Sequence, residues 1–300
     1  MLLPITTPFN AGGDLDLRAL CSNISAWNTT GISGYIILGS TGERVNLDER
    51  EYLDVIEASR REVAAGKDGL AFIVGAGQQS TRVTVNEIKR VSAAGPVDAF
   101  LVITPHFYRS AITQDTLYKY YMAVADASPV PVVLYSMPAL TGISIAPETV
   151  ARLSEHDNII GFKDSSGDVE TLSETIRVVS DDFAVLTGNG PSLYAALSAG
   201  AKGGILAVGC VAPKLCIAIY DAVKVGEHEK AQVLQSKLTP LAMAVTVKYG
   251  IGGLKAALDM IGLYGGPVRA PLENASEEAR REIARLLEEA GVISDNVAGR

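Results

Sequence analysis

Two short apolar runs stand at the ends of the segment PVVLYSMPALTGISIAPETVARLSEHDNIIGFK, residues 131–163. The runs, residues 131–135 and 159–163, are rich in β-branched side chains, which is typical of buried strands. A helix-length stretch of mixed polarity joins them. Because a strand, a helix and a second strand in this order form one unit of a parallel sheet, the segment predicts an α/β fold.

The same alternation of apolar runs and helix-length stretches recurs along most of the chain, at intervals of about 20 to 30 residues. The predicted strands are residues 3–7, 35–38, 71–74, 99–103, 131–135, 159–163, 183–187 and 204–208. Eight such strands favour a closed (β/α)8 barrel, the TIM barrel, over an open sheet. A doubly wound sheet is the alternative, but no Gly-x-Gly-x-x-Gly turn opens a helix after the first strand.

Beyond residue 225 the strand pattern ends. Residues 227–249, 254–261 and 276–290 are expected to form helices, the last with Asn274 or Ser276 as its N-cap. We therefore expect two regions. Residues 1–225 would form the barrel with the active site, and residues 226–300 a C-terminal helical region that packs on the barrel or at a subunit interface.

Composition and charge argue against several classes of partner. Of 300 residues, 48% are hydrophobic and 20% are charged, and no apolar run has membrane-spanning length. A net charge of −8 and an isoelectric point near 5.0 leave no basic face for nucleic acid or an anionic membrane.

Three cysteines without Cys-x-x-Cys spacing and a start without a signal-peptide pattern lead us to expect a cytoplasmic protein. The three histidines lack metal-ligand spacing, so no metal site is expected.

Lys163 ends the sixth predicted strand and is the candidate nucleophile. In a parallel barrel the active site lies at the carboxyl ends of the strands. Burial disfavours the ammonium form of an amine, and the neutral amine can attack a ketone. The resulting Schiff base stabilises a carbanion next to the former carbonyl, as the formation or cleavage of a carbon–carbon bond requires. For a single strand-end lysine, a solvated surface charge is the ordinary alternative.

Tyr135 ends the neighbouring fifth strand, about 4.8 Å away across the sheet. Its phenol is expected to carry protons between the imine-forming centre and the substrate or solvent, and a core tyrosine is the alternative. Gly161 lies on the same face of its strand as Lys163, where the missing side chain is expected to leave room for the amine stem.

Glycine-rich segments follow the second and the seventh predicted strands, and a third lies at the eighth. The turn at residues 39–43 contains Ser40 and Thr41, and its N–H groups and hydroxyls can converge on a carboxylate. Gly188, after the seventh strand, and Ile205, at the eighth, are expected to bring the backbone close to a ligand. Taken alone, each turn is also explained as an ordinary polar turn of a barrel.

Four motifs together resemble the dihydrodipicolinate synthase and N-acetylneuraminate lyase family of pyruvate-dependent class I aldolases. They are Gly39-Ser40-Thr41-Gly42-Glu43, Tyr135-Ser136-Met137-Pro138-x-x-Thr141-Gly142, Gly161-Phe162-Lys163-Asp164-Ser165 and Leu186-Thr187-Gly188. Their order and spacing match the family over essentially the whole chain. Within the family, the segments at residues 104–109, 132–136, 163–169 and 250–272 look most like 4-hydroxy-2-oxoglutarate aldolase.

The resemblance implies an eight-stranded barrel with a helical C-terminal region, which is usually assembled as a tetramer, a dimer of dimers. Lys163 would form the imine to pyruvate and Tyr135 would relay protons. Ser40 and Thr41 would hold the carboxylate of the 2-keto acid. Beyond what the resemblance implies, we expect Ser165 or Arg109 to meet the distal polar end of the substrate. We expect no metal and no organic cofactor, because the imine itself is the electron sink.

Two positions depart from the family pattern. Synthases of lysine biosynthesis have an arginine two residues after the proline of the tyrosine motif, where it binds the carboxylate of the aldehyde partner, but this chain has Leu140. Phe107 replaces a tyrosine that typically crosses the subunit boundary to complete a proton relay. Tyr108 or a water would have to take its place, or the relay is shorter.

From these features we expect a lyase that cleaves 4-hydroxy-2-oxoglutarate to pyruvate and glyoxylate. The first alternative is a 4-hydroxy-tetrahydrodipicolinate (dihydrodipicolinate) synthase, which condenses pyruvate with aspartate semialdehyde. Another is an aldolase for a sugar-derived keto acid. A barrel that binds a keto acid without catalysis is the least favoured, because a perturbed lysine has little structural use.

Overall fold

Eight strands follow one another in chain order around one sheet, and helices connect them in a nearly closed (β/α)8 barrel. The computed structural model describes residues 1–293. The strands are β1 (Leu2–Pro4), β2 (Gly34–Ile37), β3 (Ala71–Ala76), β4 (Ala99–Ile103), β5 (Val132–Ser136), β6 (Ile159–Asp164), β7 (Ala184–Thr187) and β8 (Gly203–Gly204). The predicted TIM barrel is confirmed.

Helices alternate with these strands and continue beyond the last one. Those of the barrel are α1 (Leu17–Trp27), α2 (Glu49–Ala64), α3 (Thr81–Ala94), α4 (Gln114–Ala127), α5 (Pro138–Thr141), α6 (Pro147–Ser154), α7 (Val169–Val178), α8 (Leu193–Ser198) and α9 (Pro213–Lys224). The C-terminal ones are α10 (His228–Met243), the π-helical η5 (Ala244–Lys248), α11 (Gly250–Met260) and α12 (Glu277–Glu289). The three expected C-terminal helices are thus present, and Ser276 is the N-cap of α12.

The eighth strand is shorter than expected. Residues 204–208 were expected to be extended, but β8 ends at Gly204, and the short 3-10 segment η4 (Ala207–Cys210) follows. Val208 and Cys210 are completely buried in this segment. A short buried apolar run has the same composition in a strand and in a helical turn, which is why the sequence pattern did not distinguish them.

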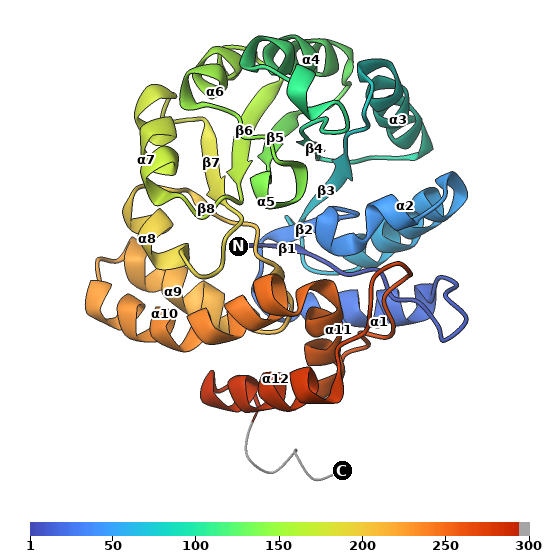
Figure 1. Cartoon of the computed structure of the whole chain (residues 1–300), viewed down its shortest axis with the longest axis vertical. Coiled ribbons are helices and arrows are strands. Elements are labelled where there is room, and N and C mark those ends of the chain that lie inside the picture. The colour runs from blue at the N-terminus through green and yellow to red at the C-terminus, as the bar shows by residue number, and fades with distance from the viewer. Residues whose placement is uncertain (294–300) are drawn as a thin grey trace. The chain divides into compact units, whose positions relative to one another are not determined.

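The chain forms two compact units. The second unit, Ala71–Ile205, contains β3 to β8, and its neighbouring strands are parallel throughout. Helices α3, α4, α6 and α7 cover the outer side of β3 to β7 (Figure 1). Apolar side chains of these strands, such as Val102, Leu134 and Phe162, are buried and form the core.

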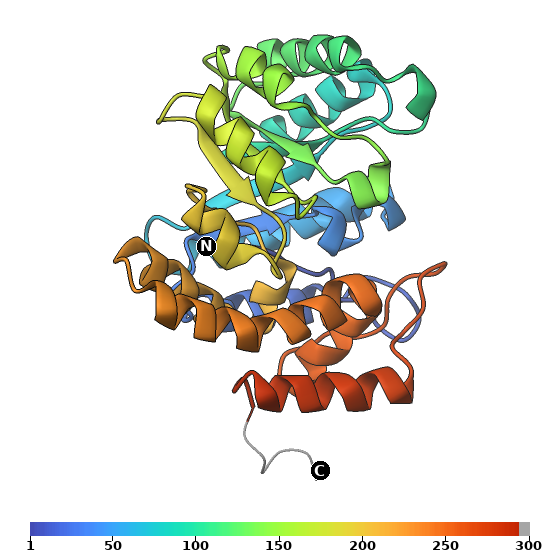
Figure 2. The ribbon, with the colours of Figure 1, turned by 60° about the vertical axis from the view of Figure 1, so that its left-hand side comes forward.

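The first unit combines Met1–Leu70 with the chain from Leu206 onward. Its strands β1 and β2 are parallel, with Leu3 opposite Tyr35. Helix α12 packs against α10 and α11 (Figure 2). Trp27 of α1 is buried, and its indole N–H donates to Cys210 O at 2.9 Å, which ties the N-terminal part of this unit to η4.

Candidate active site

Lys163 and Tyr135 occupy paired positions on the adjacent parallel strands β6 and β5. The Nζ atom of Lys163 lies 4.1 Å from the centroid of the Tyr135 ring. Only 5% of Lys163 and 4% of Tyr135 is exposed. The structure therefore brings the predicted nucleophile and the predicted proton carrier together as a buried pair near the carboxyl ends of their strands.

Gly188 is the residue that leaves room for the lysine stem. A β-carbon at this position would lie 2.7 Å from Lys163 Cε and 2.9 Å from Ser165 Cβ, and it would overlap the Ser165 hydroxyl. Ser165 is buried and lies two residues beyond Lys163, so both side chains are expected on the same face. Lys163, Ser165 and Gly188 thus form one close-packed group, in which glycine is required at position 188.

Gly161 serves a different purpose from the one we expected. A β-carbon at Gly161 would lie 2.6 Å from the carbonyl oxygen of Ala184 on β7. The close approach of the neighbouring strand, and not the lysine stem, therefore excludes a side chain at this position.

Asp164 is a buried carboxylate beside the nucleophile that the sequence analysis did not select. It accepts hydrogen bonds from the Ser166 N–H at 3.1 Å and from the Ser166 hydroxyl at 2.6 Å. Burial raises the pKa of Asp164 above its ordinary value, although the bonds from Ser166 oppose this shift. Its main-chain oxygen accepts from the Gly188 N–H at 2.6 Å, so the end of β6 is fixed to the turn after β7. Its position directly after Lys163 was the signal available in the sequence.

Two of the other predicted site residues in the second unit have well-defined surroundings. The Ile205 N–H donates to Thr187 O at 2.9 Å, which fixes the backbone of Ile205 beside the end of β7. Arg109 begins the short segment η3 (Arg109–Ala111) and packs on Gly142, where a β-carbon would lie 2.8 Å from Arg109 Cδ. Gly142 has a φ of +68° and caps α5, so Arg109 covers the turn that follows Tyr135.

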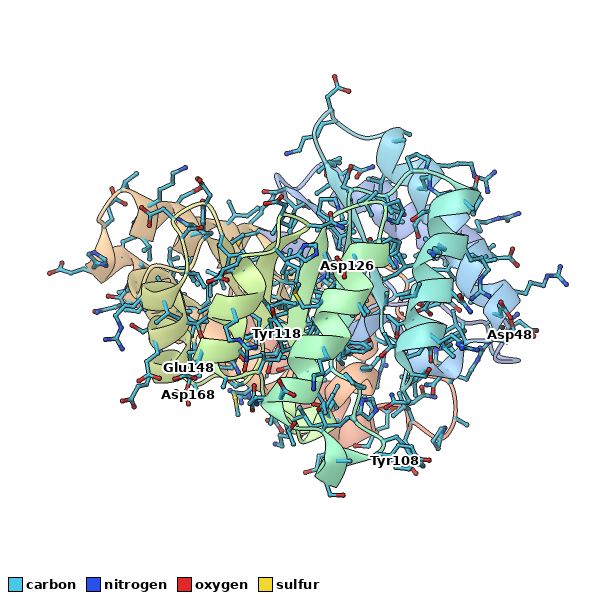
Figure 3. The ribbon with its side chains drawn as sticks, turned by 90° about the horizontal axis from the view of Figure 1, so that it is seen from above. Asp48, Tyr108, Tyr118, Asp126, Glu148 and Asp168 are labelled. Carbon is cyan, nitrogen blue, oxygen red and sulfur yellow. The ribbon has the colours of Figure 1, made fainter. Side chains whose placement is uncertain are left out.

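Tyr108 lies at the surface and not in the interior. It is 70% exposed, and its ring contacts that of Phe107 edge to face with the centroids 5.1 Å apart. Figure 3 shows the labelled Tyr108 side chain projecting from its loop. Phe107 is exposed as well, at 73%.

Ser40 and Thr41 belong to the first unit, where they form the short segment η1 (Ser40–Gly42). The Gly42 N–H donates to Gly39 O at 3.0 Å, and the Thr7 hydroxyl donates to Gly42 O at 2.6 Å. The predicted turn is therefore present and is held by Thr7, which lies three residues beyond the end of β1.

The described part of the chain contains no cluster of three or more His, Cys, Asp or Glu side chains that could hold a metal ion. Among residues 1–293, no helix has both the length and the hydropathy needed to cross a membrane. Cys21, Cys210 and Cys216 are free thiols.

Comparisons with known proteins agree with the motifs. The model of the dihydrodipicolinate synthetase family matches residues 1–290. A 4-hydroxy-tetrahydrodipicolinate synthase of Syntrophus aciditrophicus is 34% identical over 292 residues, which cover 97% of this chain and 98% of the relative.

Solved structures show the same similarity. The dihydrodipicolinate synthase of Thermotoga maritima has a TM-score of 0.91 and 30% identity, with 97% of this chain and 98% of that chain covered. The Acinetobacter baumannii enzyme, solved in complex with pyruvate, has a TM-score of 0.90 and 29% identity, with 97% and 98% covered. The chain therefore belongs to the dihydrodipicolinate synthetase family.

Proposed function

We propose that the chain is a class I aldolase that forms an imine between Lys163 and the 2-keto group of pyruvate or of a larger pyruvate-derived acid. The observation that carries the proposal is the buried Lys163 amine, 4.1 Å from the centroid of the Tyr135 ring. A poorly hydrated amine is suited to attack a carbonyl carbon, and a phenol beside it is suited to move the protons. Membership of the dihydrodipicolinate synthetase family supports this function.

In the proposed reaction, Lys163 Nζ attacks C2 of the keto acid, and the C2 oxygen leaves as water after it gains protons. Tyr135 delivers and removes these protons. The imine then draws electrons from C3, so that C3 loses a proton to give an enamine that attacks an aldehyde carbon. In the opposite direction the C3–C4 bond breaks and its electrons enter the same imine. Water finally releases the product and restores the amine, so no metal or organic cofactor is required.

Binding of the keto acid is assigned to groups around the two ends of the substrate and its reacting carbons. Ser40 and Thr41 would hold the C1 carboxylate through their turn, and the backbone at Gly188 and Ile205 would border the reacting carbons. Ser165 or Arg109 would meet the distal end of the substrate.

For the aldehyde partner, the relatives favour aspartate semialdehyde, because those that match nearly the whole chain are named 4-hydroxy-tetrahydrodipicolinate synthase. They do not support the closer likeness to 4-hydroxy-2-oxoglutarate aldolase that we expected from the sequence. Synthase activity, our first alternative, thus becomes the leading candidate.

One observation counts against aspartate semialdehyde and keeps a second candidate, cleavage of 4-hydroxy-2-oxoglutarate to pyruvate and glyoxylate. Leu140 on α5 is 61% exposed and stands where the synthases of lysine biosynthesis have an arginine. A leucine offers no charge to the carboxylate of aspartate semialdehyde.

The assembly into a homotetramer and the cytoplasmic location remain predictions from the sequence.

Two experiments test the proposal. Borohydride reduction in the presence of pyruvate, followed by peptide mass analysis, should find the reduced adduct on the peptide that contains Lys163. Failure to find it there would exclude the imine mechanism. Parallel assays of condensation with aspartate semialdehyde and of cleavage of 4-hydroxy-2-oxoglutarate then decide between the two candidates by their kcat/KM values.

A further inference from the structure

A buried ion pair lies directly after the Ser40–Gly42 turn, within the first unit. The Nζ atom of Lys255 on α11 lies 2.6 Å from Oε1 of Glu43. The side chains of the two residues are 1% and 0% exposed. Lys255 Nζ also donates to Pro267 O at 2.8 Å and lies 4.4 Å from the centroid of the buried Phe9 ring. The pair was not predicted from the sequence, although Glu43 closes one of the quoted motifs.

The Glu43 carboxylate has further partners that fix its orientation. Its Oε2 atom accepts from the Arg269 N–H at 2.9 Å and from Asn46 Nδ2 at 3.4 Å. The Arg269 guanidinium donates to Asn46 O at 2.8 Å and to both carboxylate oxygens of Glu51 at 2.6 and 2.7 Å. The C-terminal segment from Lys255 to Arg269 is thus connected to the chain on both sides of α2's N-terminus.

The backbone of Glu43 has an unusual conformation. Its φ is +52° and its ψ is 32°, in the left-handed region that residues other than glycine seldom adopt. Such a conformation persists where the surroundings hold it, and here the carboxylate is held at both oxygen atoms. The Glu43 N–H in turn donates to Ser40 O at 3.2 Å. The conformation of η1 and the contacts of the Glu43 side chain therefore constrain each other.

Stability alone does not explain two buried charges. Removing an ammonium and a carboxylate from water is costly, and a well-packed apolar pair of similar volume is often as stable or more stable. Burial lowers the pKa of Lys255, while the Glu43 carboxylate opposes this shift. An ion pair does, however, specify one geometry, because both partners lose their compensation when either moves.

We propose that Glu43 and Lys255 are positioning residues for substrate binding: their ion pair holds the Ser40–Gly42 turn in the conformation that receives the C1 carboxylate of pyruvate. The inference rests on the proposed function, which assigns that carboxylate to Ser40 and Thr41. In this proposal, α11 and the segment up to Arg269 support the binding turn without contacting the substrate themselves.

The central variant is Glu43→Asp, which keeps the charge but shortens the side chain by one methylene. To keep its contact with Lys255, the turn must move. We expect the KM for pyruvate to rise about 10- to 100-fold with a much smaller change in kcat, since small displacements of binding groups have effects of this order. Lys248→Met, which removes the exposed ion pair with Glu282, is the matched control, and its KM should stay at the wild-type value.

Coupling to Thr41 separates positioning from a purely structural role. Thr41→Val removes the hydroxyl without changing the size of the side chain. If Glu43 acts through the turn, the double variant Glu43→Asp with Thr41→Val should raise KM by clearly less than the product of the two single effects. If the KM of the double variant rises by the full product of the two single effects, the inference is overturned. A folded Glu43→Asp variant with a wild-type KM would overturn it as well.

Should Glu43→Asp fail to fold, the double variant Glu43→Gln with Lys255→Met carries the test, because it leaves no buried charge without a partner. We expect it to fold and to show a raised KM for pyruvate, and a wild-type KM would overturn the inference. Borohydride trapping on the wild-type protein distinguishes failure of the proposed function from failure of the inference about Glu43 and Lys255. Absence of the Lys163 adduct overturns the proposed function and the inference with it, whereas a normal adduct with an unchanged KM in these variants overturns the inference alone.

Discussion

Gly188 lies so close to Lys163 that a single β-carbon at position 188 would come within 2.7 Å of the lysine Cε. Gly188 also donates its N–H to Asp164 O, directly beside the lysine. The turn after β7 is therefore fitted to the stem of the buried amine. Because the amine lies over the Tyr135 ring, the position of this turn also helps to set where the amine can react.

Gly188→Ala should displace the lysine stem and Ser165, which the added methyl group would overlap. We expect kcat to fall by about 100-fold, because catalysis is sensitive to misplacement of about 1 Å. The measurement is steady-state kinetics together with the melting temperature. Gly203→Ala on β8 is the control, because its nearest neighbour would be 3.6 Å away, an ordinary contact. Equal activities of the two variants would show that the fit at Gly188 is unimportant.

Tyr135→Phe keeps the ring beside Lys163 and removes only the hydroxyl. If the phenol carries protons, the rate of adduct formation with pyruvate should fall by about 100- to 10,000-fold, the usual contribution of general acid–base catalysis. Rapid borohydride quenching at timed intervals measures this rate. Tyr121→Phe serves as the control, because Tyr121 is a buried tyrosine whose hydroxyl donates to Val102 O at 3.1 Å. A rate for Tyr135→Phe equal to that of the control would remove Tyr135 from the mechanism.

The order of the strands and the pairing of Lys163 with Tyr135 could be predicted from the sequence, because both follow from period-two burial and from the parallel connection rule. The reason why position 161 must be a glycine could not be predicted, since it depends on how closely Ala184 on the next strand approaches. The pair of Glu43 and Lys255 was equally inaccessible. It joins residues far apart in the chain, and no local pattern records which distant charge a buried carboxylate will meet.

Glu51→Gln tests the ion pair that anchors the segment after Glu43. The hydrogen bond from Arg269 lowers the pKa of Glu51, so the folded protein binds the proton less readily than the unfolded chain does. The pair therefore stabilises the fold at neutral pH, and this contribution is lost as the pH falls through the lowered pKa. We expect the free energy of unfolding at pH 7 to drop by about 1 to 2 kcal/mol, less than a fully buried hydrogen bond to a charged group contributes, because both side chains are partly exposed.

The difference between Glu51→Gln and the wild type should shrink at acid pH, as the pH falls through the lowered pKa of Glu51 and the native carboxylate becomes protonated as well. Urea unfolding at the two pH values measures it. Glu174→Gln is the control, because its pair with Arg177 is exposed and its atoms are 4.0 Å apart. A loss of stability that is the same at both pH values would mean that the charge of Glu51 contributes little.

Leu140→Arg tests what the aldehyde partner requires. Leu140 is 61% exposed on α5, so an arginine can be placed there at little cost in stability, within about 0.5 kcal/mol. A guanidinium binds a carboxylate through two parallel hydrogen bonds, which leucine cannot form. We expect the KM for aspartate semialdehyde to fall by about 10-fold, which corresponds to one charge-assisted interaction, while the KM for pyruvate stays unchanged. Leu140→Gln, of similar length but uncharged, is the control. If the wild type already uses aspartate semialdehyde efficiently and Leu140→Arg brings no gain, another group holds that carboxylate. Arg109 packs on Gly142 at the end of the same helix and is then the first residue to replace.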